Sequence, residues 1–172
     1  VASRHIIAGY DNSAALADFA KSCDVVTYEF ENVPVAAAAQ IAAVTPVCPT
    51  PDALDAAQDR LAEKEFLNRI GVATAPFRAV ERFAELSEAL QAFNGAGILK
   101  TRRLGYDGKG QAVLNGADAR QVAAAFAALG GKALILEGYV PFKAEISVIA
   151  ARSREGGFQA FDPSRNTHDS GI

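Results

Sequence analysis

The chain has 172 residues, half of them apolar, and its 17 basic and 20 acidic side chains leave a formal net charge of −3. This composition supplies enough apolar material for a buried core and excludes a predominantly disordered chain. A small negative net charge is not typical of proteins dedicated to nucleic acid, and the apolar runs are shorter than the roughly 18 residues that a membrane span requires.

The first fifty residues alternate helix and strand patterns. Asp11 to Ser13 offer caps for an amphipathic helix. The β-branched run Asp24 to Tyr28 lacks polar alternation, as do strands that are buried on both faces of a parallel sheet. Pro34 favours the first position of a following helix. The expected elements are a helix through 13–20, a strand over 24–28, a helix over 35–43 and a proline-rich connector over 44–51. We interpret this region as the closing half of an open α/β layer.

A second unit starts near residue 50. Thr50 to Asp52 cap a helical stretch that Gly71 ends, with a break expected near Asp59. Pro76 marks the start of a mixed region. The expected elements there are a helix over 81–93, strands over 98–100 and 112–114, a helix over 118–129, and strands over 133–137, 145–151 and 158–161. We interpret this unit as α+β, with a glycine-rich loop joining two antiparallel strands.

The glycine-rich loop is the most informative segment. From Lys100 to Lys109 it carries four basic side chains against one acid. Its glycines, Gly105, Gly108 and Gly110, allow positive φ angles and close approach of the backbone to a ligand. Consecutive amides in such loops form anion-binding concavities. The loop therefore indicates a phosphate ligand, and an exposed hairpin without a ligand is the alternative.

Two common phosphate loops do not fit this segment. A Walker A loop opens into a helix after Gly-Lys-Ser/Thr, whereas Gly110 is followed by Gln111 and a strand pattern. The dinucleotide fingerprint Gly-x-Gly-x-x-Gly also fails, because the glycine order differs and no helix pattern begins there. What remains is a hairpin that closes over nucleotide phosphates, as in kinases and ATP-grasp enzymes.

Charged residues in the neighbouring strand patterns support a nucleotide site. Lys100 ends an apolar strand pattern, where its ammonium would lie beneath the loop. Glu137 and Gly138 lie at the end of a second strand pattern, where their polar groups could form hydrogen bonds with the edge of an adenine base. Glu145 opens a third apolar run, where ribose hydroxyls would satisfy a buried carboxylate. The alternative is that these charged groups are exposed strand ends.

Together these motifs resemble 5-(carboxyamino)imidazole ribonucleotide synthetases, which are ATP-grasp enzymes of purine biosynthesis. The resemblance covers essentially the whole chain, and the motifs occur in the family's order and spacing. They are Val26-Thr-Tyr-Glu-Phe-Glu-Asn-Val-Pro34, Ala56-Ala-Gln-Asp-Arg-Leu-Ala-Glu-Lys64, Gly71-Val-Ala-Thr-Ala-Pro76, the loop 98–111, Leu136-Glu-Gly-Tyr-Val140 and Glu145-Ile-Ser147. The first motif and the run Gly105 to Gln111 are the most specific.

The resemblance implies a fold of two parts. Residues 1–51 would be the C-terminal part of a Rossmann-like pre-ATP-grasp domain, and residues 52–172 a truncated ATP-grasp domain with its lid at about 76–140. The chain would be an internal piece of a longer protein that binds adenine nucleotide weakly and does not turn over by itself. The family's first glycine-rich turn would lie before Val1, and its magnesium ligands beyond Ile172.

The resemblance also implies a set of site residues. Those expected to bind ATP are Arg60, Lys100, Gly105, Tyr106, Asp107, Gly108, Lys109, Gly110, Gln111, Glu137, Gly138, Tyr139, Val140, Glu145 and His168. Those expected near the imidazole nucleotide are Glu29, Asn32, Tyr106 and Asp107. Without the family, Arg60 is interpreted as a helix ion-pair partner, His168 as a surface histidine, and Glu29 and Asn32 as parts of a structural turn. Arg165 departs from the family pattern, and no role is assigned to it.

The activity implied by the resemblance is ATP-dependent carboxylation of aminoimidazole ribonucleotide. ATP would phosphorylate bicarbonate to carboxyphosphate, which would carboxylate the exocyclic amine, with ADP and phosphate as the other products. The implied cofactors are ATP and Mg²⁺, with Mn²⁺ as a substitute, and the implied assembly is a homodimer without nucleic-acid or membrane partners. The two cysteines, Cys23 and Cys48, fit a reduced cytoplasmic setting.

Three other functions remain open from the sequence. One is another ATP-grasp ligase, such as a formate-dependent transformylase or a biotin-dependent carboxylase subunit. A second is a non-catalytic nucleotide-binding module. A third is single-stranded nucleic-acid binding through Arg102, Arg103 and Lys109, which would need several stacking aromatics where only Tyr106 is nearby.

Overall fold

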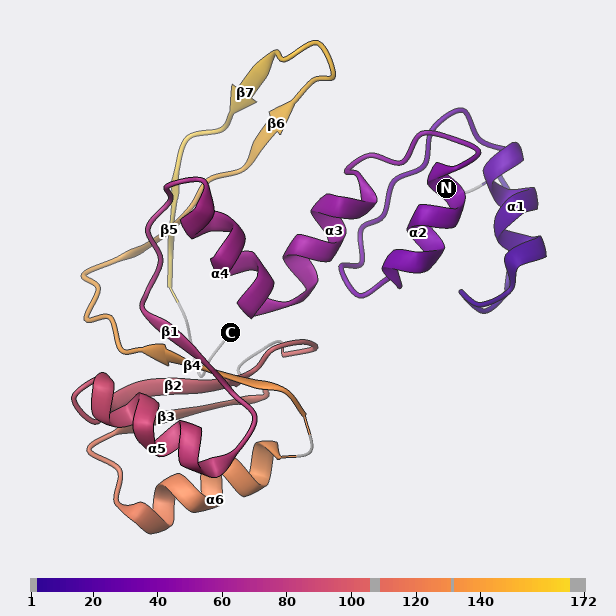
Figure 1. The fold of residues 1–172 in the computed structure, drawn as a ribbon. Coiled ribbons are helices and arrows are strands. Elements are labelled where there is room, and N and C mark those ends of the chain that lie inside the picture. Colours follow the sequence, from indigo (N-terminus) through magenta and orange to yellow (C-terminus); the bar gives the residue numbers. More distant parts are fainter. Residues whose placement is uncertain (1–2, 106–108, 131, 168–172) are drawn as a thin grey trace.

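The computed structural model describes residues 3–105, 109–130 and 132–167 (Figure 1). An N-terminal helix pair leads through a second helix pair into a sheet that carries two further helices, and short strands follow. In chain order the elements are α1 (Ser13–Lys21), α2 (Val35–Ala42), α3 (Pro51–Gln58), α4 (Arg60–Arg69), β1 (Phe77–Val80), α5 (Phe83–Ala92), β2 (Ala96–Thr101), β3 (Gln111–Asn115), α6 (Ala119–Leu129), β4 (Leu134–Gly138), β5 (Glu145–Ser147), β6 (Ala150–Arg152), β7 (Phe158–Ala160) and β8 (Ser164–Asn166).

The N-terminal helices form where the caps predict. The Asn12 side chain accepts a hydrogen bond from the Ala15 amide at 3.0 Å and so caps α1. Pro34 was expected to be the first residue of α2, but it is the N-cap, and the helix begins at Val35. A small core forms between these helices and the segments that follow them. Its buried residues are Ala20, Val26, Ile41 and Val47.

The expected strand over 24–28 is wrong in extent. Val26 makes one isolated parallel bridge with Val47, and the strand is not buried on both faces, because Val25 is exposed. The Val26 amide donates to the Pro46 carbonyl, and the Cys48 amide donates to the Val26 carbonyl. Pro46 has no N–H to extend this ladder toward Asp24, so the pairing stops there.

Asp59 separates α3 from α4, as its position between two helical patterns predicts. Thr50 caps α3, and Asp59 has an extended backbone with φ −122° and ψ 114°. Its side chain accepts hydrogen bonds from the Leu61 and Ala62 amides, which caps α4. The chain therefore turns at Asp59 without a loop, and both helix ends lie at one point.

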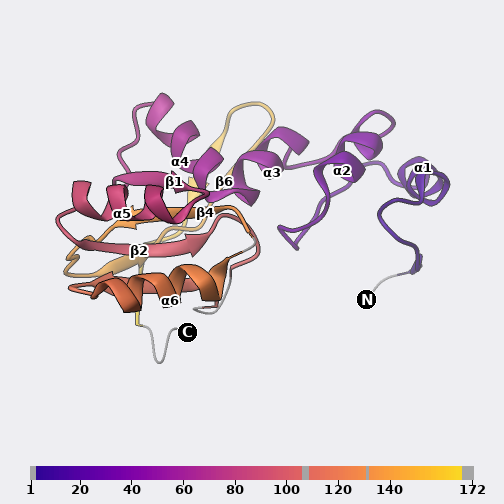
Figure 2. The same ribbon diagram turned by 60° about the horizontal axis from the view of Figure 1, so that its bottom comes forward.

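A four-stranded antiparallel sheet, in the order β1-β4-β2-β3, forms the largest layer. Helix α5 connects β1 to β2 and α6 connects β3 to β4, so two βαβ units interleave. Helix α5 packs on β1 and β4 and α6 on β2 and β3, so both cover one face of the sheet (Figure 2). The predicted α+β unit, with β2 and β3 antiparallel on either side of the glycine loop, is confirmed.

The two faces of this sheet differ in chemistry because side chains alternate along a strand. Leu99, Leu134 and Leu136 are fully buried beneath α5 and α6, and each such leucine contributes roughly 1.5–3 kcal/mol. Ile98 and Lys100 alternate with Leu99 and point to the opposite face. That face bears the charged residues of the candidate site.

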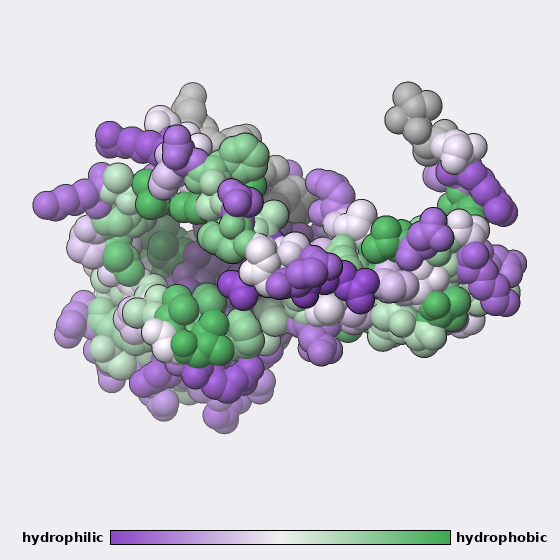
Figure 3. Space-filling model, turned by 90° about the horizontal axis from the view of Figure 1, so that it is seen from above, coloured by the Kyte–Doolittle hydropathy of each residue, from purple (hydrophilic) through white to green (hydrophobic). Residues whose placement is uncertain are grey.

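The expected continuous strand over 145–151 is wrong. It is divided into β5, which pairs with β8, and β6, which pairs with β7. Both two-stranded pairs are exposed, because an isolated pair of strands has no second layer to cover it. Large apolar side chains such as Ile149, Phe158 and Phe161 are exposed here. Seen from above, hydrophobic patches lie over the part of the molecule that holds the sheet and these strands (Figure 3).

Gly97 is required by close packing between β2 and β4. A Cβ atom at this position would lie 2.8 Å from the Glu137 carbonyl oxygen and 2.9 Å from Leu136 Cδ1. We expect Gly97→Ala to lower the free energy of unfolding by about 1–3 kcal/mol, since neither the backbone nor a fully buried leucine can give way. Urea unfolding measures this, with the exposed Gly157→Ala as control. Equal stability of the two variants would contradict it.

Candidate nucleotide site

The residues at the break between α3 and α4 form hydrogen bonds with the base of the glycine loop. We call Gln58, Asp59 and Arg60 the clasp, because each of these consecutive residues contacts the segment 101–105. The Arg60 amide donates to the Arg102 carbonyl at 3.0 Å. The Arg60 guanidinium donates to the carbonyls of Thr101 at 3.1 Å and Gly105 at 2.9 Å. These hydrogen bonds place Arg60 on the loop and not in a helical ion pair.

Asp59 and Arg102 form the charged part of the clasp. Arg102 Nε donates to both carboxylate oxygens of Asp59, and Nη2 donates to Oδ2 at 2.7 Å. Burial raises the pKa of Asp59, but the hydrogen bonds from Arg102 and from the Leu61 and Ala62 amides outweigh it, so the pKa lies below its ordinary value. The carboxylate is thus ionised and fixes Arg102 at the start of the loop.

A second charged cluster lies on the sheet face opposite α5 and α6. Lys100 Nζ is 3.0 Å from Glu137 Oε2, and Lys64 Nζ from α4 is 3.6 Å from the same oxygen. The register pairs Ile98 with Glu137, which makes Lys100 its diagonal neighbour on the same face. Lys100 therefore lies beside Glu137, and two ammonium groups share one carboxylate.

This cluster carries a formal excess of one positive charge in a place that water reaches poorly. The exposed fractions of the side chains are 14% for Lys64, 22% for Lys100 and 11% for Glu137. Burial of a charge is costly unless it is paired. An anion such as a phosphate oxygen would complete the pairing, which is the property expected at a nucleotide site.

The proposed adenine segment is divided between buried and exposed residues. Glu137 and Gly138 are both buried at the end of β4, and the Gly138 amide donates to the Pro76 carbonyl at 2.7 Å. That amide is therefore not available to a base, and the Glu137 carboxylate is already paired with lysine. Tyr139 and Val140, which follow, are about half exposed, and the Val140 carbonyl accepts a hydrogen bond from the Phe142 amide at 2.9 Å.

Glu145 lies on an exposed strand rather than in a buried one. Asn166 on β8 donates to Glu145 Oε1 at 2.8 Å, and the same Asn166 amide nitrogen is 2.9 Å from Ser147 Oγ. The strand register places Glu145 opposite Asn166. The cross-strand amide of Asn166 is therefore one partner of the Glu145 carboxylate.

Of the four residues expected near the imidazole nucleotide, the two that the structure describes, Glu29 and Asn32, line different cavities. Asn32 lines a cavity of about 250 Å³ together with Glu31, Gln58, Arg60 and Gly105. Glu29 lines another, of about 310 Å³, beside the N-terminal helices. The structure thus brings Asn32, but not Glu29, into one cavity with the clasp and the loop.

The far side of the glycine loop is only partly described. Gly110 has a φ of 74° and its carbonyl accepts from the Thr101 amide at 2.8 Å, and Gln111 pairs with Lys100 at the start of β3. Lys109 has interaction partners in the fold. Four of the predicted site residues lie outside the described residues: Tyr106, Asp107, Gly108 and His168.

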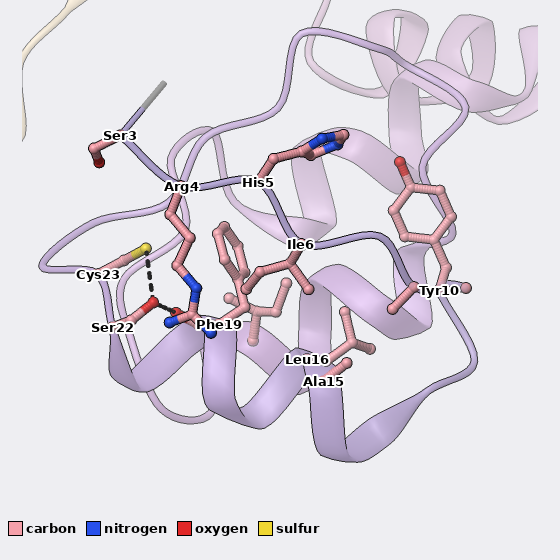
Figure 4. A pocket seen from close by; sticks show the side chains of 13 residues that line it. Ser3, Arg4, His5, Ile6, Tyr10, Ala15, Leu16, Phe19, Ser22 and Cys23 are labelled. Carbon is pink, nitrogen blue, oxygen red and sulfur yellow. Dashed lines mark hydrogen bonds between the residues drawn. The ribbon is translucent and has the colours of Figure 1, made fainter. Parts of the chain in front are cut away.

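A larger cavity lies at the other end of the molecule, away from the lysine cluster. Its volume is about 510 Å³, and it lies between the segment 3–10 and α1. Figure 4 shows Ile6, Leu16 and Phe19 among the side chains that line it. The lining is mainly apolar and holds none of the predicted site residues.

Within residues 3–105, 109–130 and 132–167, no three His, Cys, Asp or Glu side chains gather in a way that could hold a metal ion. The same ranges contain no helix with the length and apolarity needed to cross a bilayer.

Sequence reasoning overlooked Lys64, Gln58 and Asp59 as parts of the site. For Lys64 a signal existed, because it lies four residues after Arg60 and therefore on the same face of α4. For Gln58 and Asp59 the signal was weaker. They adjoin Arg60 in one of the family motifs, but their partners are distant in sequence.

Comparison with known proteins places the chain in a family. Residues 65–172 match the ATP-grasp domain, and residues 1–58 match the ribonucleotide synthetase preATP-grasp domain. The chain belongs to the ATP-grasp family. The expected fold, an ATP-grasp domain preceded by a pre-ATP-grasp domain, is therefore confirmed.

Two relatives with high identity to this chain carry the same name. The N5-carboxyaminoimidazole ribonucleotide synthase of Brucella melitensis is 53% identical over all of this chain and 48% of its own length. That of Pseudomonas aeruginosa is 43% identical over 98% of this chain and 46% of its own length. The resemblance found in the sequence is confirmed, and the chain spans about half the length of these relatives.

Solved structures of similarly named proteins also resemble the chain. The N5-carboxyaminoimidazole ribonucleotide synthetase of Thermus thermophilus has a TM-score of 0.85 at 41% identity, covering 96% of this chain and 44% of that one. The N5-carboxyaminoimidazole synthetase of Staphylococcus aureus, complexed with ADP, has a TM-score of 0.90 at 31% identity, covering 97% and 44%.

Proposed function

We propose that the full-length protein carboxylates 5-aminoimidazole ribonucleotide with bicarbonate and ATP, and so forms a C–N bond. The observation that carries the proposal is the shared carboxylate of Glu137, which holds Lys64 and Lys100 with an excess positive charge on the sheet face next to the glycine loop. The relatives named N5-carboxyaminoimidazole ribonucleotide synthase support the choice of acceptor.

In this proposal the chain's residues act by position and charge. Phosphoryl transfer needs in-line placement and neutralisation of the developing charge more than covalent chemistry from the protein. Lys100 would bind a phosphate oxygen, Arg60 would hold the loop base over it, and Tyr139 and Val140 would meet the purine through their backbone. Glu145, held by Asn166, would accept from ribose hydroxyls.

Carboxyphosphate would form when the γ-phosphoryl group of ATP passes to bicarbonate. The acceptor amine would then attack its carboxyl carbon and release phosphate. The intermediate is hydrolytically fragile, so the site must exclude water during transfer. The loop from Gly105 to Gln111, anchored by the clasp, would serve as this lid.

The remaining parts of the proposal rest on the resemblance. They are the division into residues 1–51 and 52–172, contact of Glu29, Asn32, Tyr106 and Asp107 with the imidazole nucleotide, nucleotide contact by His168, a homodimer and a cytoplasmic location. Magnesium, or manganese in its place, would supply further charge neutralisation.

Acceptor dependence tests the function. We expect full-length protein to release ADP with bicarbonate and aminoimidazole ribonucleotide together, and to release much less when the ribonucleotide is withheld. Release that responds instead to glycinamide ribonucleotide with formate would assign a different ATP-grasp ligase. Tight ATP binding without stimulated hydrolysis by any acceptor would indicate a non-catalytic module.

A further inference from the structure

Gln58, the last residue of α3, connects three segments through one side-chain amide. Its Nε2 donates to the carbonyl of Glu31 at 2.7 Å and to that of Val33 at 2.5 Å. Its Oε1 accepts from Arg103 Nη2. Only 6% of the residue is exposed, so water cannot readily replace these partners.

The partners of this amide require glutamine. A primary amide offers two N–H donors and one carbonyl acceptor, and here the donors face two carbonyls while the acceptor faces a guanidinium. Glutamate has the same shape but no donor. It would keep the contact with Arg103 and place a carboxylate oxygen against the carbonyls of Glu31 and Val33.

The segments joined by Gln58 border one cavity. Glu31 and Asn32 line it on one side, and Arg60, Leu104 and Gly105 line it on the other, with a volume of about 250 Å³. Asp59 and Arg60 hold the same loop base through Arg102 and through the carbonyls of Thr101 and Gly105. The residues at the end of α3 therefore bind both the segment 31–33 and the base of the glycine loop.

We propose that Gln58 is a positioning residue that couples the segment 31–33, on the acceptor side of the site, to the base of the glycine loop, residues 101–105. This inference rests on the proposed function. With Gln58 in place, the segment 31–33 and the loop base keep a fixed position relative to each other, so that carboxyphosphate and the acceptor amine meet in the cavity that these segments line. Without its two donated bonds, the segment 31–33 separates from the loop, while Lys64, Lys100 and Glu137 are untouched.

Loss of the Gln58 contacts would uncouple ATP hydrolysis from carboxylation of the acceptor, but it would not stop the protein from using ATP. ATP would still phosphorylate bicarbonate, but water would hydrolyse carboxyphosphate back to bicarbonate and phosphate. The net reaction would then be hydrolysis of ATP to ADP and phosphate. Carboxylated product per ADP would fall, and KM for the acceptor would rise more than KM for ATP.

The test compares variants of the full-length protein by measuring ADP and carboxylated product in the same samples. We expect Gln58→Glu to lower product per ADP at least about fivefold, the factor that corresponds to losing one or two neutral hydrogen bonds. The matched control is Gln40→Glu, because the Gln40 amide also donates to a backbone carbonyl, that of Ser13, but far from the loop. This control should leave the ratio unchanged.

A second variant keeps the test decisive if Gln58→Glu does not fold. Arg103→Met removes the donor to Gln58 Oε1 and leaves the bonds to Glu31 and Val33, so product per ADP should fall with little change in KM for the acceptor. An unchanged ratio in a folded Gln58→Glu protein, or in Arg103→Met when the first variant does not fold, overturns the coupling role. If the unaltered protein forms no carboxylated product, the proposed function itself fails.

Discussion

Replacing Lys100 with alanine is expected to weaken adenine nucleotide binding by about 1.5–3 kcal/mol, or roughly tenfold to a hundredfold in Kd. Lys100 supplies one of two ammonium groups around the Glu137 carboxylate. Its removal leaves Lys64 and Glu137 as a neutral pair, so the excess positive charge that would attract a phosphate disappears. Isothermal titration of the full-length protein with ADP measures the change.

The control for this experiment is Lys21→Ala. Lys21 is an exposed lysine in the last turn of α1, at the opposite end of the molecule (Figure 1). Its removal changes the net charge by the same amount without touching the cluster. If the two variants bind ADP equally well, Lys100 is a strand-end lysine with no role in nucleotide binding.

Asp59→Ala is expected to lower the free energy of unfolding by about 2–4 kcal/mol. The change removes the cap of α4 and leaves the Arg102 guanidinium, whose side chain is 23% exposed, without its bidentate partner. Asp55→Ala, at an exposed position of α3, should change stability by less than about 0.5 kcal/mol. Urea unfolding at neutral pH compares them, and losses of similar size would contradict the clasp.

The same carboxylate predicts a pH dependence. Hydrogen bonds hold the pKa of Asp59 below its ordinary value of 3.8 in the folded state, so folding favours the ionised form. Its contribution to stability is complete above that ordinary value and is lost as the pH falls through the lowered folded-state pKa. Asp59→Asn should remove this part of the acid sensitivity. An unchanged acid-unfolding profile in Asp59→Asn would count against it.

Features encoded within a few residues were predictable. The break at Asp59, the caps at Asn12 and Thr50, and the antiparallel strands on either side of the glycine loop follow from local patterns, and the structure confirms them. Capping and glycine conformation depend on neighbours within one turn of chain, so the sequence alone reveals them. The family motifs added the fold, which the comparisons confirm.

Strand pairing was predicted less well, because it depends on partners that are distant along the chain. The runs 24–28 and 145–151 both have the β-branched, apolar character of buried strands. The first makes a single bridge to Val47, and the second divides between two different partners, β8 and β7. Propensity describes how a segment fits a sheet, but it does not say which neighbour the segment will find.

The sequence by itself determined the helices, the glycine loop and the membership of a family of nucleotide-binding proteins. Only the tertiary structure decided which charges meet. Glu137 lies 37 residues from Lys100 and reaches it through the register of β2 and β4, and Gln58 reaches Arg103 because the break at Asp59 lies against the loop base. Such contacts depend on strand register and on how helices pack on a sheet, and neither is encoded in the spacing of the residues involved.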